Sequence, residues 1–284
     1  MDVEVLPVRT GGHTCWTYAS AAEHRGMLTA YFDQGLRNGD LLAYFGSPPE
    51  HTAPALDSLR AADHDPEQLI DEGSLVIGLA DDLFLRAGRF DPDAAIQDCR
   101  DLVAHATANG YRGVRAATEL SWPAATPFHR ASWPEFEFRV DLFTAAMPFT
   151  ARCCYDTREW EPDELRLIHA VHSDAPAAGD DTPFKLRGNV DGSLGIEGEL
   201  DFRDADAVRS ILIAAASDLT LPALDISRLL FADVAVMRAI AAVALEFQRS
   251  FGRVQIRGAS PHFREVWDLL LLHDLVPKAE MSPW

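Results

Sequence analysis

The spacing of apolar residues predicts alternating strands and helices over most of the chain. Short apolar runs bounded by glycine, proline or polar residues are typical of buried strands, whereas apolar residues three or four positions apart are typical of helices. In the first part of the chain the predicted strands cover 41–46, 75–79, 111–118 and 149–155, and the predicted helices cover 91–108, 134–146 and 162–172. This alternation predicts an α/β sandwich around a mainly parallel sheet.

The C-terminal part of the chain shows the same alternation. Asp191-Gly192 is a typical turn pair of a β-hairpin, and it joins two predicted strands, 184–190 and 194–198. The further predicted strands cover 221–226 and 253–257, and the predicted helices cover 204–217, 235–251 and 261–273. The C-terminal part is therefore predicted to be a second α/β domain.

The stretch between the two parts has a different composition. Residues 173–183 read SDAPAAGDDTP, so small, acidic and proline residues replace apolar ones. Such a composition is typical of a solvated linker. We therefore predict a first domain over 1–172, a linker over 173–183 and a second domain over 184–284.

Composition argues against several classes of function. The formal net charge of -19 in 284 residues repels phosphate backbones, so we expect no binding to nucleic acid. No apolar run is long enough to span a bilayer, and the N-terminal residues do not resemble a secretory signal. We therefore expect a cytoplasmic protein without membrane contact, in which Cys15, Cys99, Cys153 and Cys154 are reduced.

Several short motifs of the first domain resemble the MEDS domain, a sensory module named from methanogens, methylotrophs and a dichloromethane regulator. Their order and spacing match together, and they span nearly all of the first domain. The matching motifs are His13-Thr14-Cys15…Tyr18, Gly35-Leu36…Gly39-Asp40, Gly110-Tyr111-Arg112-Gly113…Arg115, Glu119-Leu120-Ser121-Trp122, Cys153-Cys154-Tyr155-Asp156 and His169. The resemblance implies a RecA- or KaiC-like fold that has turned from nucleotide hydrolysis to sensing.

The residues after the predicted strand 41–46 support the loss of nucleotide chemistry independently. A phosphate loop needs glycines for close backbone approach and a lysine that reaches the phosphates. The chain instead reads Gly46-Ser47-Pro48-Pro49-Glu50-His51-Thr52. The prolines remove backbone donors, and Glu50 adds a negative charge where an anion would bind. We therefore predict a degenerate phosphate loop that binds no nucleotide.

The stretch LPALDISRLLFADVAVM, residues 221–237, resembles the signature of STAS domains, the fold of anti-sigma-factor antagonists. Those domains usually carry Asp-Ser-Ser-Gly after the phenylalanine, and the second serine accepts a regulatory phosphate. Here the matching run is Asp233-Val234-Ala235-Val236, which has no hydroxyl group. The resemblance implies a STAS-like α/β domain without the usual phosphorylation switch, whose partner is an anti-sigma factor or a related GHKL-type kinase. The partner-binding residues that it implies are Asp225, Ser227, Asp233, Val234 and Ala235.

His13 and Cys15 form the centre of the candidate sensing site in the first domain. In an extended strand both side chains point to one face, where they could hold a metal ion, a ligand or a reactive thiolate beside an imidazolium. We favour a buried thiol next to a hydrogen-bonded histidine. Because zinc usually needs four ligands at recognisable spacing, which the sequence does not show, we expect neither a metal site nor a cofactor.

Other residues extend the candidate sensing site. Glu119 and Trp122 follow a predicted strand, and α/β sheets bind ligands at the carboxyl ends of their strands. We expect a pocket at this edge of the sheet, although Trp122 is equally compatible with ordinary packing. The candidate ligand-sensing residues are His13, Cys15, Tyr18, Arg115, Glu119, Trp122 and Cys153.

The sequence contains no nucleophile elbow, zinc-protease motif or paired-cysteine metal motif, so we do not expect an enzyme. We expect a bacterial signalling regulator in which a small-molecule or redox sensor controls a non-phosphorylatable STAS-like output domain. Two alternatives stay open: a non-catalytic scaffold subunit of a signalling complex, and a thiol enzyme that uses Cys15 and His13. An oligomer is compatible with each of them.

Overall fold

The computed structural model describes residues 11–47, 52–86, 89–125, 127–172, 182–219 and 221–283. These residues divide into two compact units, each with one five-stranded sheet. Residues 48–51 of the predicted degenerate loop, 46–52, and residues 173–181 of the predicted linker, 173–183, lie outside the described residues. The domain boundaries at 172 and 183 stay predictions.

The first unit contains a parallel sheet, as the sequence predicts. Its strands follow the order β1-β7-β6-β2-β3, and every neighbouring pair is parallel. The strands are β1 His13–Tyr18, β2 Leu41–Gly46, β3 Leu75–Leu79, β6 Val114–Glu119 and β7 Phe149–Asp156. The chain leaves the neighbouring strands β2 and β6 in opposite directions, so their carboxyl ends form the switch point where such sheets bind ligands.

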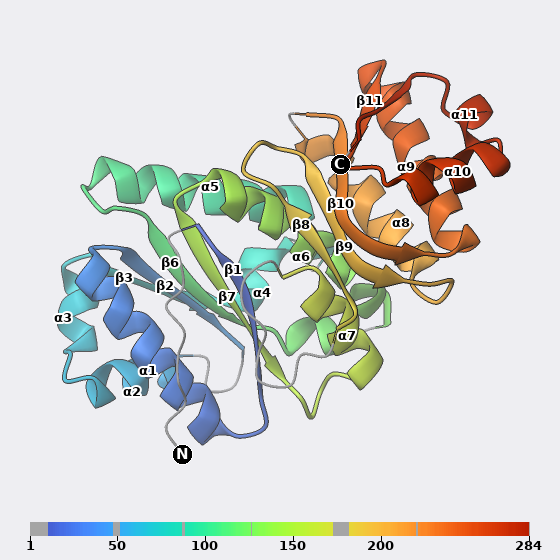
Figure 1. Cartoon of the computed structure of the whole chain (residues 1–284). Coiled ribbons are helices and arrows are strands. Elements are labelled where there is room, and N and C mark those ends of the chain that lie inside the picture. The colour runs from blue at the N-terminus through green and yellow to red at the C-terminus, as the bar shows by residue number, and fades with distance from the viewer. Residues whose placement is uncertain are drawn as a thin grey trace. The chain divides into compact units, whose positions relative to one another are not determined.

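Helices cover both faces of this sheet. Figure 1 shows α1 and α2 on one side and α5 on the other. The helices and short elements of this part of the chain are α1 Ala21–Asn38, α2 Ala53–Ala61, α3 Pro66–Asp71, α4 Ala80–Phe84, β4 Leu85–Arg86, β5 Arg89–Phe90, α5 Pro92–Ala108, η1 Trp122–Ala125, α6 Pro127–Ala146 and α7 Pro162–Ala170. Residues Pro134–Ala145 of α6 and the end of α7, from Leu167, belong to the second compact unit. None of the helices in the described ranges combines the length and the apolar composition that crossing a bilayer requires.

Local signals explain α1, a helix that the sequence analysis does not predict. Its N-cap Ser20 accepts a hydrogen bond from the Glu23 amide at 3.2 Å, and the Glu23 carboxylate accepts one from the Ala19 amide at 2.8 Å. Gly39 ends the helix in the left-handed region, with φ of 75°. Polar residues, among them the buried His24, are interspersed among the apolar residues of α1, so the apolar residues do not show a clear helical spacing in the sequence.

A buried ion pair lies between β6 and the end of α1. Arg115 is fully buried, and its Nε donates to the Asp40 carboxylate at 3.0 Å. Arg115 and Arg152 both lie over the ring of Tyr31, with distances to its centroid of 4.9 and 4.3 Å. Gly35 leaves the space that Arg115 fills, because a Cβ there would come within 2.5 Å of Arg115 Cδ. The side chains of two arginines, Arg115 and Arg152, are therefore buried beneath α1.

The second unit contains a mixed sheet in the order β12-β11-β10-β9-β8. The hairpin β8–β9 is antiparallel, and Gly192 in its turn has a φ of 83°, which confirms the hairpin predicted at Asp191-Gly192. The other neighbouring pairs are parallel. The elements are β8 Phe184–Gly188, β9 Leu194–Leu200, α8 Ala205–Ala214, η2 Ala215–Asp218, β10 Ala223–Ala232, α9 Val234–Phe251, β11 Val254–Arg257, α10 Pro261–Leu269, α11 Leu272–Leu275 and β12 Ala279–Met281.

One continuous core fills the second unit. Met237, Ile240 and Phe247 of α9 are buried in it, as their helical spacing predicts. Side chains of α6 belong to the same core, among them Leu142. Nearby, the Asp141 carboxylate accepts a hydrogen bond from the Gly188 amide at 2.7 Å.

Two element predictions in the second unit are wrong. β10 continues to Ala232 and does not end at Ile226, as the predicted strand 221–226 does, because the ladder to β9 extends as far as Leu200. The predicted helix 261–273 is divided into α10 and α11, because Leu271 adopts a left-handed backbone with φ of 56°.

Two boundaries in the N-terminal part of the chain also differ. β6 begins at Val114 and not at Tyr111, since the Tyr111 amide donates to Ala106 at the end of α5. α6 begins at Pro127 and not at Pro134, so Pro134 lies inside a continuous helix that lacks one amide donor.

The buried ion pair yields a stability prediction. Asp40→Ala removes the carboxylate that compensates Arg115, so we expect the free energy of unfolding to fall by about 3–5 kcal/mol. Arg37→Ala removes a largely exposed partner of Asp33 on α1, and we expect a change below about 1 kcal/mol. Urea denaturation of both variants measures the difference. Equal losses in the two variants would contradict a structural role of the Arg115–Asp40 pair.

Candidate functional site

The candidate sensing residues on β1 lie on two opposite faces of the sheet. Successive side chains of a strand alternate, and β1 pairs with β7 in an unbroken register from His13 to Tyr18. His13 and Cys15 therefore share one face, whereas Tyr18 lies on the other, in the apolar cluster beneath α1. The single pocket expected around all three side chains is thus divided by the sheet.

On the first face, His13 meets a cysteine that is distant in the sequence. His13 Nε2 lies 3.3 Å from Cys153 Sγ, and both residues are buried. Cys15 is the register neighbour of Cys153, and neighbours in a parallel pair point to the same face. The structure therefore brings together three of the candidate residues, His13, Cys15 and Cys153, as one imidazole and two thiols.

On the second face, a carboxylate at the end of β6 accepts two hydrogen bonds. Glu119 Oε1 accepts one from the Tyr18 hydroxyl at 3.0 Å and one from the Ser121 hydroxyl at 2.6 Å. Glu119 is only 7% exposed, and within the described residues its Oε2 has no hydrogen-bond partner. A buried acceptor without a donor is suited to a ligand that carries an N–H or O–H group.

An uncharged ring borders this carboxylate. His24 of α1 stacks on Tyr18, with ring centroids 4.3 Å apart. Burial lowers the pKa of His24 to about 4, so the ring is neutral at pH 7. Burial, and then the charge of Glu119, raises the pKa of Tyr18, so its hydroxyl keeps the proton that it donates.

Two of the other candidates have surroundings of a different kind. Trp122 belongs to an aromatic cluster, in which its ring lies 5.3 Å from that of Phe84 and 5.1 Å from that of Trp133. This supports the packing alternative for Trp122. Arg115 lies near the amino end of β6, about 13 Å along the strand from Glu119, and its contact with Asp40 holds it there.

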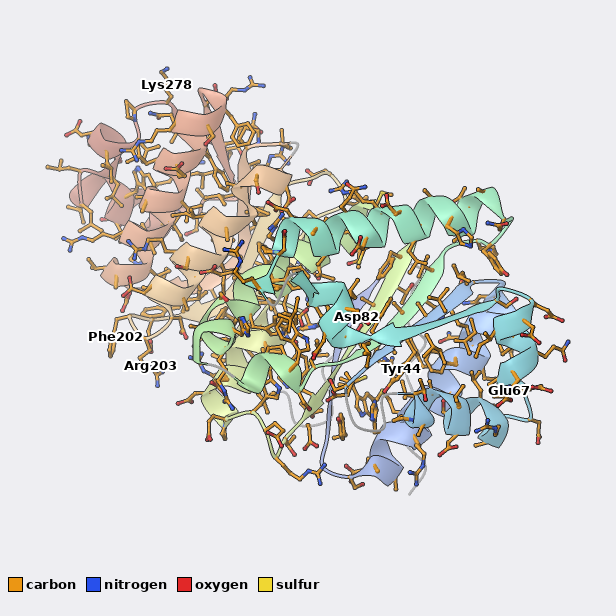
Figure 2. The ribbon with its side chains drawn as sticks, turned by 180° about the vertical axis from the view of Figure 1, so that it is seen from behind. Tyr44, Glu67, Asp82, Phe202, Arg203 and Lys278 are labelled. Carbon is orange, nitrogen blue, oxygen red and sulfur yellow. The ribbon has the colours of Figure 1, made fainter. Side chains whose placement is uncertain are left out.

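A surface groove at the carboxyl ends of β2 and β3 was missed by the sequence analysis. It has a volume of about 430 Å³, which is in the range of small-ligand sites. Apolar side chains and three aspartates line it, and Figure 2 labels one of these, Asp82. The lining residues are Phe45, Gly78, Leu79, Asp82, Leu83, Asp98, Cys99, Asp101, Leu102 and His105. Burial raises the pKa of Cys99 to about 12, so its thiol stays protonated.

In the second unit, Asp233 organises the start of α9. Its carboxylate accepts hydrogen bonds from the Val236 amide at 3.0 Å and from the Phe202 amide at 2.8 Å. Val234 in the first turn is exposed, and Ala235 is half-buried. Asp225 accepts a hydrogen bond from the Ser227 amide at 2.9 Å in the middle of β10. Of the five predicted partner-binding residues, Val234 is the exposed one.

Exposed apolar side chains gather near this helix start. Phe202 is 70% exposed, Leu230 75%, Phe231 52% and Val234 47%. Figure 2 shows Phe202 beside Arg203 at the margin of the molecule. We call these four residues the α9 surface. Exposed apolar patches of this kind often mark sites of protein binding.

The family comparison agrees with the motifs of the first part of the chain. The family model of MEDS, the methanogen/methylotroph, DcmR sensory domain, matches residues 12–173. This range is more than half of the chain, and it contains all the candidate sensing residues. No curated protein matches the chain.

The neutral state of His24 predicts a pH dependence of stability. Its pKa is about 4 in the folded chain and 6.5 in its unperturbed state, so the unfolded chain binds the proton first. The resulting stabilisation is complete above about pH 6.5 and is lost as the pH falls towards 4, by roughly 3 kcal/mol. His24→Phe keeps the ring stack and should remove this part of the acid slope. Denaturation curves between pH 7 and pH 4 measure it, and identical slopes for both proteins would contradict the assignment.

Proposed function

We propose, because the chain belongs to the MEDS family, that it is a signalling regulator in which a sensory unit controls a protein-binding unit. The sensory unit responds to a small molecule or to a redox signal. The second unit is a STAS-like output domain, and it binds an anti-sigma factor or a related GHKL-type kinase. The observation that carries the output role is the exposed α9 surface around the capped helix start at Asp233.

The STAS-like assignment is supported by the order of elements and by the start of α9. Strands and helices alternate from β9 to β12, with one hairpin in front. Asp233 caps the start of α9. In STAS domains the regulatory serine lies two positions after the residue that matches Asp233. Ala235 occupies that position, so the partner surface is permanently in the unphosphorylated form.

The sensory role is supported by the Glu119 cluster. A small ligand with an N–H or O–H group would bond to Glu119 Oε2, next to the uncharged ring of His24. The carboxyl ends of parallel strands are the usual place for such a ligand. In this proposal the sensory domain has a RecA-like topology but neither binds nor hydrolyses nucleotides.

A thiol enzyme is the second candidate function. His13 Nε2 lies 3.3 Å from Cys153 Sγ, a distance at which an imidazole activates a thiol. The nucleophile of such an enzyme would therefore be Cys153, with Cys15 beside it. Turnover of a substrate that is lost in Cys153→Ser but kept in Cys154→Ser would favour this function over a sensor.

Substitution of the α9 surface tests the output role. Val234→Asp places a charge in the centre of the proposed interface, and burying it without a counter-charge should weaken binding of a GHKL-type anti-sigma factor at least about tenfold. Leu275→Asp is the matched control, because Leu275 of α11 has a similar exposure, 46%. Titration calorimetry measures affinity, and circular dichroism checks the fold. Unchanged affinity in Val234→Asp would place the interface elsewhere.

The missing hydroxyl gives a second test. A kinase that phosphorylates ordinary STAS antagonists should leave this chain unmodified, because Val234, Ala235 and Val236 offer no acceptor. Ser227 is half-buried in β10 and lacks the helix N-terminus that favours a phosphate. Intact-mass spectrometry after incubation with kinase and ATP shows whether the chain has been phosphorylated. One phosphate per chain on Ser227 would show that the phosphorylation site has moved to Ser227 and has not been lost.

A further inference from the structure

We propose that Cys15 and Cys153 form a reversible disulfide when the chain meets a hydroperoxide, with His13 as the base that activates Cys153. The proposal deepens the redox form of the proposed sensory function and rests on it, because it names the class of oxidant and the residues that respond. All three residues belong to the first compact unit. Partner binding at the α9 surface could fail while this disulfide forms, and the reverse also holds.

Strand register brings the two thiols together. Figure 1 shows β1 and β7 side by side, and Cys15 and Cys153 are direct partners in this parallel pair. Their side chains therefore point to the same face. Neighbouring strands lie about 4.8 Å apart, and disulfide-bonded cysteines usually have Cα atoms about 4.4–6.8 Å apart. The register thus supplies a Cα separation at which a disulfide closes.

A small adjustment of the sheet completes the bond. Side chains of direct partners run side by side, so their Cβ atoms lie about as far apart as the strands, about 4.8 Å, whereas a disulfide needs about 3.5–4.5 Å. Closing the bond therefore draws β1 towards β7 by roughly 1 Å. A disulfide under such tension is more easily reduced, which suits a reversible signal. The reduced and oxidised sheets differ in shape, and a signal needs two such states.

His13 gives one of the two thiols the chemistry of a nucleophile. Its Nε2 lies 3.3 Å from Cys153 Sγ, which is within reach of proton transfer. The thiolate, and not the thiol, attacks an oxidant, so the thiol proton has to pass to a base. His13 lies two positions before Cys15 on β1 and therefore faces the same side of the sheet. One strand thus carries both the base and the second thiol.

The other two cysteines have different surroundings. Cys154 points to the opposite face of β7, and burial raises the pKa of its thiol. Cys99 lies on α5, and burial raises the pKa of its thiol to about 12. Both thiols therefore stay protonated near neutral pH, and they serve as internal references for the oxidation.

The reaction balances with one molecule of hydrogen peroxide. His13 accepts the proton of Cys153, the thiolate sulfur attacks one peroxide oxygen, and the O–O bond breaks. The leaving hydroxide takes the proton from His13 and departs as water, which leaves a sulfenic acid on Cys153. The Cys15 sulfur then attacks the Cys153 sulfur, the S–O bond breaks, and the leaving hydroxide takes the Cys15 proton and departs as a second water. The two thiols have lost two electrons and two protons, and the peroxide has been reduced to water.

The first test uses the unaltered full chain, so it does not depend on how a variant folds. Equimolar hydrogen peroxide is added at neutral pH, the remaining thiols are trapped with N-ethylmaleimide, and the digested chain is mapped by mass spectrometry. We expect a Cys15–Cys153 cross-link within one chain, trapped thiols on Cys99 and Cys154, and the return of all four thiols with dithiothreitol. Four reduced thiols after peroxide, or a disulfide that joins two chains or other cysteines, would overturn the proposal.

Variants then assign the roles of the two cysteines. Cys15→Ser should stop the reaction at a sulfenic acid on Cys153, which dimedone traps, because the second thiol is missing. Cys153→Ser should leave Cys15 reduced. Cys154→Ser is the matched control, because Cys154 lies on the same strand but points to the opposite face, and it should form the disulfide at the rate of the unaltered chain. Loss of the disulfide in Cys154→Ser, or no dimedone adduct in Cys15→Ser, would refute the assignment.

The pH profile of alkylation separates a chemical role of His13 from a structural one. In the Cys15→Ser background, iodoacetamide should alkylate Cys153 readily at neutral pH. His13→Gln should slow this reaction at least about tenfold there, and the rate should recover as the pH rises towards the ordinary thiol pKa of about 8.5. Circular dichroism checks that the fold persists. The same pH profile with and without His13 would exclude it as the base.

Discussion

The alternation of side chains across the parallel sheet of the first unit is the constraint on which its chemistry depends. β1 and β7 pair in register without a bulge, so each residue has a defined face. His13, Cys15 and Cys153 are placed on one side, and Tyr18, Arg152 and Cys154 on the other. A shift by one residue would exchange the two sets and would place Arg152 where the thiol of Cys153 now lies.

The two faces of this sheet give their buried side chains different chemical surroundings. Beneath α1, the sheet buries two arginines against Tyr31, and Asp40 supplies the compensating charge for Arg115. Burial raises the pKa of Cys154 on this face even with Arg152 near it, so that thiol is inert. On the opposite face Cys153 has an imidazole at 3.3 Å. Neighbouring cysteines in the sequence therefore have different surroundings, because they occupy opposite sides of the strand.

The second unit combines a well-packed core with a group of exposed apolar side chains that would gain stability from burial. α9 buries one stripe of apolar residues, and Asp233 satisfies the amides at its start. Next to this cap, Phe202, Leu230 and Phe231 remain in contact with water although each would gain from burial. Selection for stability alone does not account for such a group, whereas a partner that covers it would. The cap at Asp233 and these exposed side chains therefore mark the start of α9 as the candidate contact surface of the second unit.

Local signals in the sequence were sufficient for much of the architecture. Alternating apolar runs predicted the parallel sheet, the pair Asp191-Gly192 predicted the hairpin, and Asp91 before Pro92 predicted the start of α5, where the Asp91 carboxylate accepts from the Ala94 amide at 3.0 Å. The family motifs identified the first part of the chain, and they included several of the side chains that meet in the fold. These features depend on residues that are close together in the chain, so a sequence pattern contains them.

Tertiary structure alone decided which of the candidate residues meet. The sequence grouped His13, Cys15 and Tyr18 because they are near one another, but strand pairing separated Tyr18 and brought in Cys153, 140 positions away. The groove beside Asp82 and the extension of β10 past Phe231 likewise depend on contacts between distant segments. Such contacts follow from strand order and register, which periodicity does not encode. For this reason the sequence determined the elements and the family of this protein, and the fold determined its sites.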